Sequence, residues 1–273
     1  MLNYIIWDID PVIFSIGSIS IRWYGLMFAL GFLISHRVLS YIFKKEGKPE
    51  SDVDTLTIYM VSATVIGARL GHFLFYEWES LMESPLSWAK DLIIPPYAGL
   101  ASHGAAIGIF VALFLYARTK KDQSYLWIID RMVIVVALTG CCIRLGNLMN
   151  SEIIGTATTV PWAFVFKQVD DVPRHPAQLY EAIYCIFLLA FLFWLWKQKK
   201  GQTREGLLSG LFMVMLFTLR FLDEFLKENQ ETFEDKLTLN MGQILSIPAI
   251  LFGFLLLWIA YRKKQAPQPI TKT

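Results

Sequence analysis

Five charged or titratable side chains lie inside or beside long apolar stretches of this chain: Arg22, Arg69, His103, Arg144 and Arg220. An arginine at the centre of a bilayer costs about 2.5–3.5 kcal/mol on insertion scales, so such residues are usually retained for a function. Arginine suits phosphate because its planar guanidinium donates paired hydrogen bonds, and histidine can act as a general base near neutral pH. All five are predicted to fall toward the same membrane face, which predicts an arginine-rich cavity for an anionic lipid at the depth of one headgroup layer.

The densest polar segment follows Arg144. Asn147 comes three residues later, so the two side chains share a face if this stretch is helical, and Asn150 and Glu152 extend the polar array. The simpler alternative is a helix end whose arginine reaches to the membrane interface. The density of polar residues, followed by Gly155, favours a binding site instead.

Arg220 and His103 also have structural alternatives. Glu224 follows Arg220 by one helical turn and could simply offset its burial with an ion pair. A second arginine at the predicted depth of Arg144 favours an anionic ligand instead. His103 stands among small residues, where a substrate could approach closely. A lone histidine is as readily a hydrogen-bonded structural residue, and spacing alone leaves both interpretations open.

Weaker candidates share the same predicted depth. Tyr24 belongs by default to an aromatic belt at the interface. Arg69 stands between glycines that permit close helix packing, so it could be an interhelical hydrogen-bond donor. The other candidates are individually weak and are joined only by their predicted depth: His72, His175, Gln178, Glu181, Asn240 and Gln243.

Seven apolar stretches must position these residues, and each is long enough to cross a hydrocarbon core as a helix of about 20 residues. The stretches are 15–43, 54–76, 97–117, 125–143, 176–196, 206–226 and 241–261. Basic clusters follow the first, third, fifth and seventh stretches, whereas the other connections are acidic. The positive-inside rule then places the N-terminus outside and the C-terminus in the cytoplasm.

These stretches predict an all-α integral membrane protein with seven transmembrane helices in a single domain, residues 1–264. Two outward segments are expected. One is an arm, 77–96, whose tryptophans suit the membrane interface. The other is a small extracytoplasmic head, 147–174, that contains a short strand or hairpin. Residues 227–240 are expected to form a solvated acidic connector, and 265–273 a disordered cytoplasmic tail.

The composition narrows the possible functions. Hydrophobic residues make up 55% of the chain and charged residues 18%, as expected for a membrane protein, and no nucleic-acid partner is expected. Cys141, Cys142 and Cys185 all fall within apolar stretches and are expected to be small buried residues, not a disulfide framework. No cluster of His or Cys has metal-ligand spacing, so we expect no metal and no cofactor. Residues 1–11 contain two aspartates and no basic region, so we expect no cleavable signal peptide.

Several of these segments resemble the bacterial prolipoprotein diacylglyceryl transferase family. The family signature is Gly-Arg-x-Gly-Asn-Phe-x-Asn-x-Glu-x-x-Gly. Residues 143–155 match it, except that Ile143 replaces the first Gly and Leu148 replaces the Phe. A further departure is Leu216, where the family often carries Tyr. The other matching segments run in family order along nearly the whole chain: 22–26, 67–71, 103–104, 175–181, 220–225 and 241–248.

The resemblance implies an activity in the bacterial cytoplasmic (inner) membrane. The diacylglyceryl group of phosphatidylglycerol would pass to the thiol of the lipobox cysteine in a prolipoprotein signal peptide, as the first step of lipoprotein maturation. A thioether would form and glycerol phosphate would leave. His103 would be the base, and Arg144 and Arg220 would bind the phosphate without a metal or cofactor. The implied phosphatidylglycerol-binding set is Tyr24, Arg69, Arg144, Asn147, Asn150, Glu152, Arg220 and Glu224, supported by His175, Gln178, Glu181 and Gln243.

Two other functions would use similar features. A phospholipid or anionic-lipid transporter could line its cavity with the same arginines, but inverted repeats would be expected, and the sequence has none that we detect. A phosphatidyl-type transferase of the CDP-alcohol class would need an aspartate-rich metal motif within an apolar stretch. The sequence does not contain one.

Overall fold

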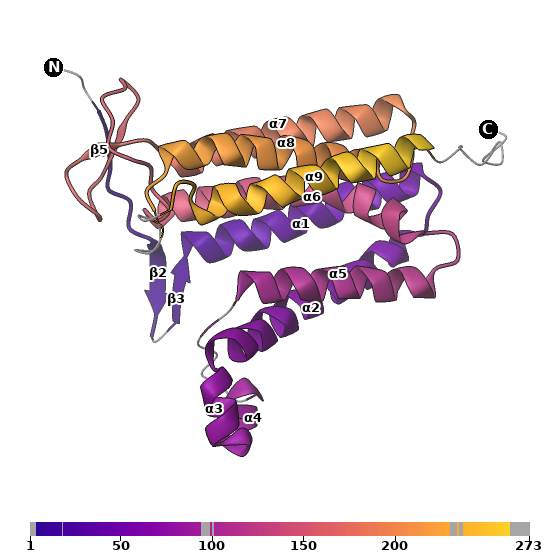
Figure 1. Cartoon of the computed structure of the whole chain (residues 1–273), viewed down its shortest axis with the longest axis horizontal. Coiled ribbons are helices and arrows are strands. Elements are labelled where there is room, and N and C mark those ends of the chain that lie inside the picture. The colour runs from indigo at the N-terminus through magenta and orange to yellow at the C-terminus, as the bar shows by residue number, and fades with distance from the viewer. Residues whose placement is uncertain are drawn as a thin grey trace. The chain divides into compact units, whose positions relative to one another are not determined.

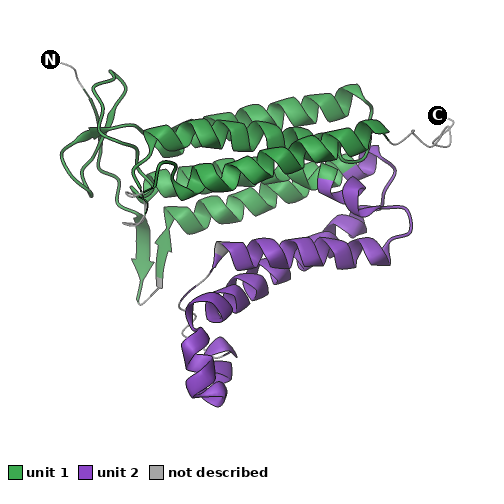
Figure 2. Ribbon diagram, viewed as in Figure 1, with its two compact units in different colours: residues 1–42, 130–273 green, residues 43–129 purple. Residues whose placement is uncertain are grey.

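The computed structural model describes residues 4–17, 19–93, 99, 101–229, 234 and 237–262. The chain divides into two compact units (Figure 2): residues 1–42 and 130–273 form unit 1, and residues 43–129 form unit 2. The predicted tail, 265–273, lies outside the described residues.

Each of the seven apolar stretches contains a helix. These helices are α1 (Trp23–Lys45), α2 (Glu50–Tyr76), α5 (Ser102–Thr119), α6 (Tyr125–Met149), α7 (Ala177–Gln198), α8 (Leu207–Asp223) and α9 (Met241–Arg262) (Figure 1). Five of them, α1, α2, α6, α7 and α9, are long and apolar enough to cross a membrane. Because α5 is a shorter apolar helix and α8 has 17 residues, the third and sixth spans stay predictions.

The first apolar stretch begins differently from the prediction. Residues expected at the start of a helix form a hairpin instead, in which β2 (Val12–Ile16) pairs antiparallel with β3 (Ile19–Arg22), and α1 follows directly. The cause is local, because apolar side chains alternate with serines in the period of a strand. The hydroxyls of Ser15 and Ser20 lie 2.9 Å apart across the pair, and Gly17 takes a φ of 60° in the turn. A count of apolar residues alone missed this alternation.

The helices of unit 1 approach closely at glycines. Helix α8 packs against both α7 and α9. A Cβ at Gly253 would lie 2.8 Å from Val214 Cγ2, and a Cβ at Gly210 would lie 2.8 Å from Leu257 Cγ. Small residues of this kind are typical of helix contacts in membranes. As predicted, all three cysteines are buried and free: Cys141, Cys142 and Cys185.

A small sheet lies at one end of the unit 1 helices. Strand β4 (Phe164–Phe166) pairs parallel with β1 (Ile5–Trp7) and antiparallel with β5 (Pro173–Arg174), which confirms the predicted strand within the head segment. Its phenylalanines pack on Leu148 in the last turn of α6, and Trp7 Nε1 donates to Leu148 O at 3.0 Å. We call this end of unit 1 the strand end, and the opposite end, where α7 connects to α8, the turn end.

Unit 2 is built on a close contact between α2 and α5. A Cβ at Gly67 would lie 2.6 Å from Gly104 O, and one at Gly71 would lie 2.5 Å from Gly104 Cα, so the two backbones touch. The predicted arm forms two short helices, α3 (Trp78–Glu83) and α4 (Pro85–Ile93), which bury none of their residues. Its location at the membrane interface stays a prediction.

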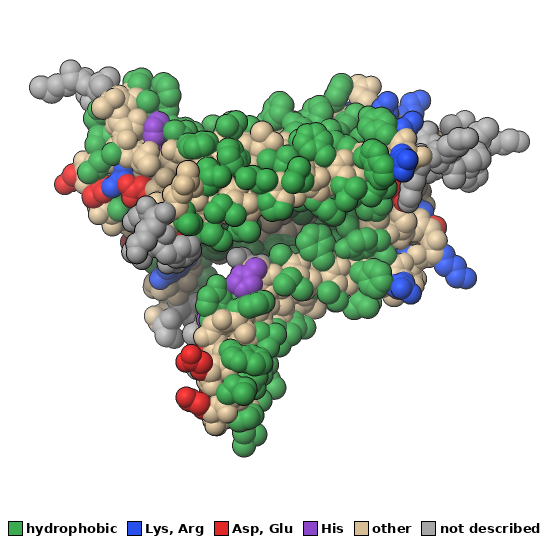
Figure 3. All heavy atoms as spheres, viewed as in Figure 1, with side chains coloured by type: hydrophobic (Ala, Val, Ile, Leu, Met, Phe, Trp, Pro, Cys, Tyr) green, Lys and Arg blue, Asp and Glu red, His purple; other side chains and the backbone are tan. Residues whose placement is uncertain are grey.

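The surface of unit 1 separates apolar and charged side chains. Hydrophobic side chains cover the sides of its helices, and basic side chains gather near the turn end (Figure 3). The basic residues of the α7–α8 connection and of the last turn of α7 are Lys197, Lys199, Lys200 and Arg204. This distribution suits a membrane protein whose helix ends differ in charge.

Candidate active site

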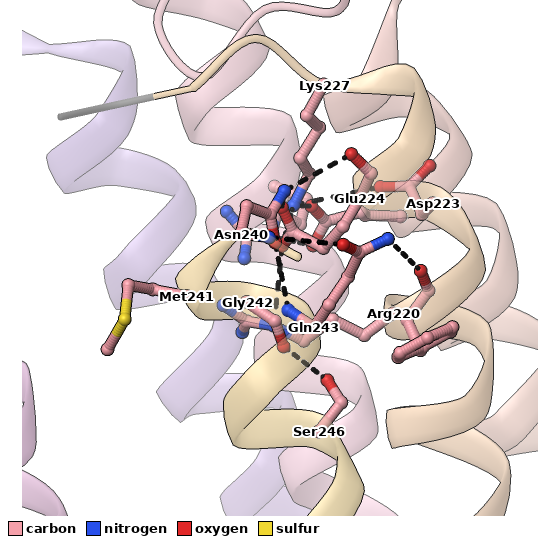
Figure 4. Close-up of polar contacts among 12 residues, drawn as sticks. Arg220, Asp223, Glu224, Lys227, Asn240, Met241, Gly242, Gln243 and Ser246 are labelled. Carbon is pink, nitrogen blue, oxygen red and sulfur yellow. Dashed lines mark hydrogen bonds and ion pairs between the residues drawn. The ribbon is translucent and has the colours of Figure 1, made fainter. Parts of the chain in front are cut away.

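Charged side chains from α6, α7 and α8 meet at the strand end of unit 1, beside η1 (Glu224–Leu226), the short 3-10 turn that continues α8. Four of these side chains are buried, so each of their charges needs a partner. Figure 4 shows the part of this group contributed by α8 and the residues after it. We call the whole group the ion cluster, and it consists of Arg144, Glu181, Arg220, Asp223, Glu224 and Lys227.

Arg144 joins the ion cluster to the polar segment that follows it. Its Nε pairs with the Glu181 carboxylate, and its Nη1 donates to Asn147 Oδ1 at 3.3 Å. Glu152 Oε1 then accepts from Asn147 Nδ2 at 2.8 Å and from Asn150 Nδ2 at 3.2 Å. The structure therefore brings together the four polar residues that the sequence singled out, and adds Glu181 to them.

The chain turns tightly after α6 and brings Glu152 back to the helix end. Ser151 and Ile153 have φ values of 53° and 57°, a left-handed conformation that is uncommon outside glycine. The N–H of Glu152 donates to Asn147 O at 3.1 Å and closes the turn. Strain of this kind costs about 1–3 kcal/mol per residue and concentrates at functional sites. The turn thus supports a role for Glu152 beyond packing.

Two glycines of the same segment allow close approaches. A Cβ at Gly146 would lie 2.9 Å from Tyr24 Cδ2, so the Tyr24 ring packs directly on α6. A Cβ at Gly155 would lie 2.5 Å from His175 O and 2.7 Å from Leu226 O. Any larger residue at either position would displace the ring or the backbone.

An open cavity of about 460 Å³ is lined by residues that include Arg22, Tyr24 and Asn150. Asn150 Oδ1 is buried, and no described residue donates a hydrogen bond to it. A buried acceptor without a partner is unusual, and a ligand hydroxyl could satisfy it. Two residues of the predicted lipid-binding set, Tyr24 and Asn150, therefore face one cavity.

Lys227 and Asp223 are the ion-cluster residues that the sequence analysis missed. The prediction of a solvated connector beginning at residue 227 is wrong at its first position, because the Lys227 side chain is 1% exposed. Its Nζ lies 2.9 Å from Glu224 Oε1 and 3.7 Å from Asp223 Oδ2, and it also pairs with Glu181. A signal existed: Arg220, Glu224 and Lys227 follow one another at four and three residues, the spacing of one helix face.

Arg220 and Glu224 form the ion pair expected from their spacing, with Arg220 Nε 3.5 Å from Glu224 Oε1. Asn240 Nδ2 donates to Glu224 Oε2 at 3.2 Å. A Cβ at Gly242 would lie 2.4 Å from Glu224 Cδ, so α9 begins in direct contact with this carboxylate. Glu224 is thus held from several sides.

Asn240 and Gln243 form a reciprocal cap at the start of α9 (Figure 4). The N–H of Gln243 donates to Asn240 Oδ1 at 2.9 Å, and the N–H of Asn240 donates to Gln243 Oε1 at 3.2 Å. This is a capping box, which fixes where a helix begins. Gln243 Nε2 also donates to Phe221 O at 3.5 Å. The predicted supporting role of Gln243 has this physical basis.

His175 and Gln178 lie beside the ion cluster. His175 Nδ1 is 3.0 Å from Tyr180 OH, which accepts from Trp162 Nε1 at 2.8 Å. Because indole can only donate, the Tyr180 proton is available to His175. Burial lowers the pKa of His175 and favours its neutral form. Gln178 Nε2 donates to Glu152 O at 2.6 Å and helps to hold the turn after α6.

Arg69, in unit 2, is a buried hydrogen-bond donor, as its structural alternative predicted. Its guanidinium donates to the backbone oxygens of Asp91 at 2.6 Å, Gly99 at 3.3 Å and Leu92 at 3.4 Å. The side chain therefore fixes the end of α4. Direct contact of Arg69 with a lipid stays a prediction.

His103 is an exposed residue in the first turn of α5. Its ring centroid lies 4.8 Å from that of Phe75 and 5.8 Å from that of Tyr76, near the end of α2. The neighbouring His72 places its Nε2 3.1 Å from Glu77 Oε1. His103 belongs to unit 2 and Arg144 to unit 1, and their approach to a common substrate stays a prediction.

A model of the prolipoprotein diacylglyceryl transferase family matches residues 11–259. The chain belongs to this family. A phosphatidylglycerol–prolipoprotein diacylglyceryl transferase of Chloroherpeton thalassium is 44% identical over 266 residues, which cover 96% of this chain and 97% of that protein. Proteins of the same name from Tolumonas auensis (40% identical, 94% and 98% covered) and Bacteroides fragilis (41% identical, 97% and 98% covered) are also similar. The resemblance seen in the sequence motifs is thus confirmed.

As a member of the prolipoprotein diacylglyceryl transferase family, the chain is a multi-pass membrane protein. Its signature segment, 143–155, supplies the hydrogen-bond network around Arg144. Of the other matching segments, 175–181, 220–225 and 241–248 contribute to the ion cluster or hold it in place. Most of the motif residues of unit 1 therefore serve one region of the structure.

Proposed function

We propose that this protein transfers the diacylglyceryl group of phosphatidylglycerol to the cysteine thiol of a prolipoprotein. The relatives described above carry these two substrates in their names. The observation that carries the proposal is the ion cluster, where two arginines are held by buried acids at one end of apolar helices. That is the chemistry needed for a phosphate at the depth of a lipid headgroup.

The reaction is an alkyl transfer. The thiolate sulfur attacks the glycerol carbon that carries the phosphate ester, and a carbon–sulfur bond forms. The carbon–oxygen bond to phosphate breaks with its electron pair on oxygen, and the thiol proton passes to a base. The products are a thioether and glycerol phosphate. The step needs a thiolate, and it is favoured by cations preorganised around the departing phosphate.

Arg144 and Arg220 are the proposed phosphate ligands. Their side chains are 18% and 37% exposed, whereas the acids that pair with them, Glu181 and Glu224, are 4% and 8% exposed. The acids therefore hold the arginines from the buried side. Both terminal nitrogens of Arg220 are without a partner among the described residues, so they can donate to phosphate oxygens.

Asn150 and Tyr24 are proposed to face the glycerol headgroup. Asn150 lines the open cavity, and its buried, unpartnered Oδ1 would accept a hydrogen bond from a headgroup hydroxyl. Glu152 and Asn147 orient Asn150 and Arg144 through the network described above.

His103 is the proposed base. The variant His103→Gln keeps a hydrogen-bonding group but cannot take the thiol proton. A free thiol titrates near ~8.5, so raising the pH supplies thiolate without a base. The variant should be slow near neutral pH and recover toward the pKa of the thiol, while the parent protein changes less. Equal pH profiles at matched amounts of folded protein would exclude His103 as the base.

The proposed topology has seven spans in one domain, 1–264, in the bacterial inner membrane, with the N-terminus outside. The head segment, 147–174, would then face outward and the basic turn end would face the cytoplasm. A cysteine introduced at Ala157 should react with a membrane-impermeant thiol reagent in spheroplasts, whereas a cysteine at Gln202 should not. The reverse pattern would overturn this orientation.

The decisive experiment uses purified protein, phosphatidylglycerol and a signal peptide with a lipobox cysteine. Mass spectrometry should find one diacylglyceryl group on the peptide, with one glycerol phosphate released for each. A peptide with Ser in place of that Cys should stay unmodified, and phosphatidylethanolamine should be a poor donor. The alternative function, lipid transport, would move lipid between leaflets and leave the peptide mass unchanged.

A further inference from the structure

We infer that Lys227 is a positioning residue that sets the spacing of Arg144 and Arg220. The inference rests on the proposed function, because the spacing of the two guanidinium groups affects the reaction only if both bind the substrate phosphate. The contacts form one chain of alternating charge, in which each acid bridges two cations. The order of this chain is Arg144, Glu181, Lys227, Glu224 and Arg220.

Among these five charged residues, Lys227 is the one that contacts both bridging acids. Its Nζ lies 2.9 Å from Glu224 Oε1 and also pairs with Glu181, while Asp223 Oδ2 is 3.7 Å away. The ammonium group has three donors, so it can serve both bridging acids at once, and its charge also faces Asp223. Arg144 and Arg220 each pair with only one acid of the ion cluster.

Burial makes this charge indispensable. The Lys227 side chain is 1% exposed, and those of Glu181, Asp223 and Glu224 are between 4% and 8% exposed. Three cations face three acids in the ion cluster, so loss of the lysine leaves one buried negative charge in excess. The acids would then draw the arginine donors inward, away from the phosphate, and repel the anionic substrate.

The backbone holds Lys227 against the signature segment. Gly155 and Lys227 form an antiparallel bridge, and the N–H of Thr156 donates to Leu226 O at 2.8 Å. A Cβ at Gly155 would lie 2.7 Å from Leu226 O, so only glycine allows this approach. The last glycine of the signature thus helps to place Lys227 against the two acids that pair with the arginines.

The test compares Lys227→Met, Lys227→Arg and the double variant Lys227→Met/Glu181→Gln in the peptide lipidation assay. We expect Lys227→Met to lower kcat by about 100-fold, the scale of losing one preorganised donor, with the KM for peptide unchanged. Lys227→Arg keeps the charge and should retain most activity. The double variant restores the charge balance and should recover about tenfold over Lys227→Met, a coupling typical of contacting residues.

Lys167→Met is the matched control, because Lys167 pairs with Asp171 on the surface of the same unit and should leave activity unchanged. A merely structural Lys227 would lower the melting temperature of Lys227→Met while activity per folded molecule stayed at the parent value. That outcome, or a double variant no better than Lys227→Met, would overturn the inference.

A second readout separates this inference from the proposed function. Thermal stabilisation of the parent protein by added phosphatidylglycerol in detergent measures lipid binding without turnover. If the parent fails to lipidate the peptide, the proposed function falls. The inference then requires that Lys227→Met still needs more phosphatidylglycerol than the parent and Lys227→Arg for the same stabilisation, and equal titrations would end it.

Discussion

Helix α6 carries charged side chains near both of its ends, and the two groups use different partners. Near its start, Asp130 accepts from the N–H of Gly206 at 3.0 Å and the N–H of Ser209 at 2.9 Å, at the first turn of α8. Arg131 Nη2 donates to Gly201 O at 2.9 Å. Arg144 comes fourteen residues after Asp130 on the same helix, or about 21 Å at 1.5 Å per residue, and binds side chains instead.

This difference separates a structural charge from one available to a ligand. Asp130 supplies a cap to α8 from another helix, and its partners are two backbone N–H groups and the Ser209 hydroxyl, which need an acceptor in any state of the protein. At the strand end, the charges pair with other side chains and leave arginine donors exposed. A buried charge alone is therefore a weak sign of function. The kind of partner it has is a stronger one.

The largest effect should come from Arg220→Lys. Lysine keeps the charge but lacks the fork that grips two phosphate oxygens. We expect kcat/KM to fall by about 100-fold or more, by analogy with the loss of one oxyanion-hole donor. The control is Arg262→Lys at the end of α9, where the arginine stacks on Trp258 away from the ion cluster. Near-parent turnover in Arg220→Lys would remove the paired phosphate contact from the account.

Two glycine substitutions in α9 should separate the site from the scaffold. Overpacking costs about 1–3 kcal/mol, and the two positions differ in whether the added methyl group disturbs the ion cluster or only the packing of α8 and α9. In Gly242→Ala the new Cβ must displace Glu224, so the lipidation rate should fall. In Gly253→Ala the clash is with Met213 and Val214, so the melting temperature should fall while turnover per folded molecule holds. A Gly242→Ala variant that loses stability but keeps its lipidation rate would contradict the role of Gly242 in holding Glu224.

Asp130→Ala should cost stability and spare the reaction. It removes the cap of α8 and leaves the Ser209 hydroxyl and two N–H groups without their acceptor. The expected loss is about 2 kcal/mol, within the range for a lost cap or an unsatisfied buried donor. Thermal unfolding in detergent would measure it. A strong fall in turnover with unchanged stability would contradict the structural role.

The smallest effect is expected at Asp170, on the surface of the strand end. The Arg174 guanidinium holds the pKa of Asp170 below its ordinary value of about 3.9. Because the folded-state pKa is lowered, the pair stabilises the protein above about pH 4 and loses its effect as the pH falls through the folded-state value. Asp170→Asn should cost about 0.5 kcal/mol at pH 7. The difference from the parent should vanish in acid, and a difference that grew in acid would reverse the assignment.

The sequence predicted the helices well because apolar length is a local signal, and it missed the β2–β3 hairpin because only apolarity was counted there. It also picked out Arg144, Asn147, Asn150 and Glu152, which do form one network. It missed Asp130 and Lys227 because the partners of a charge come from distant parts of the chain. Lys227, which follows α8, pairs with Glu181 in α7. The spacing of Arg220, Glu224 and Lys227 indicates a shared face but not this contact.

The most direct test of the account measures peptide lipidation and melting temperature side by side for Arg144→Lys and Asp130→Asn. Both substitutions alter one charged side chain on the same helix. The account predicts that Arg144→Lys loses about 100-fold in turnover with a melting temperature near that of the parent. It predicts that Asp130→Asn melts at a lower temperature and turns over normally per folded molecule. If Asp130→Asn loses turnover while Arg144→Lys keeps it, the assignment of the strand end as the reaction site is wrong.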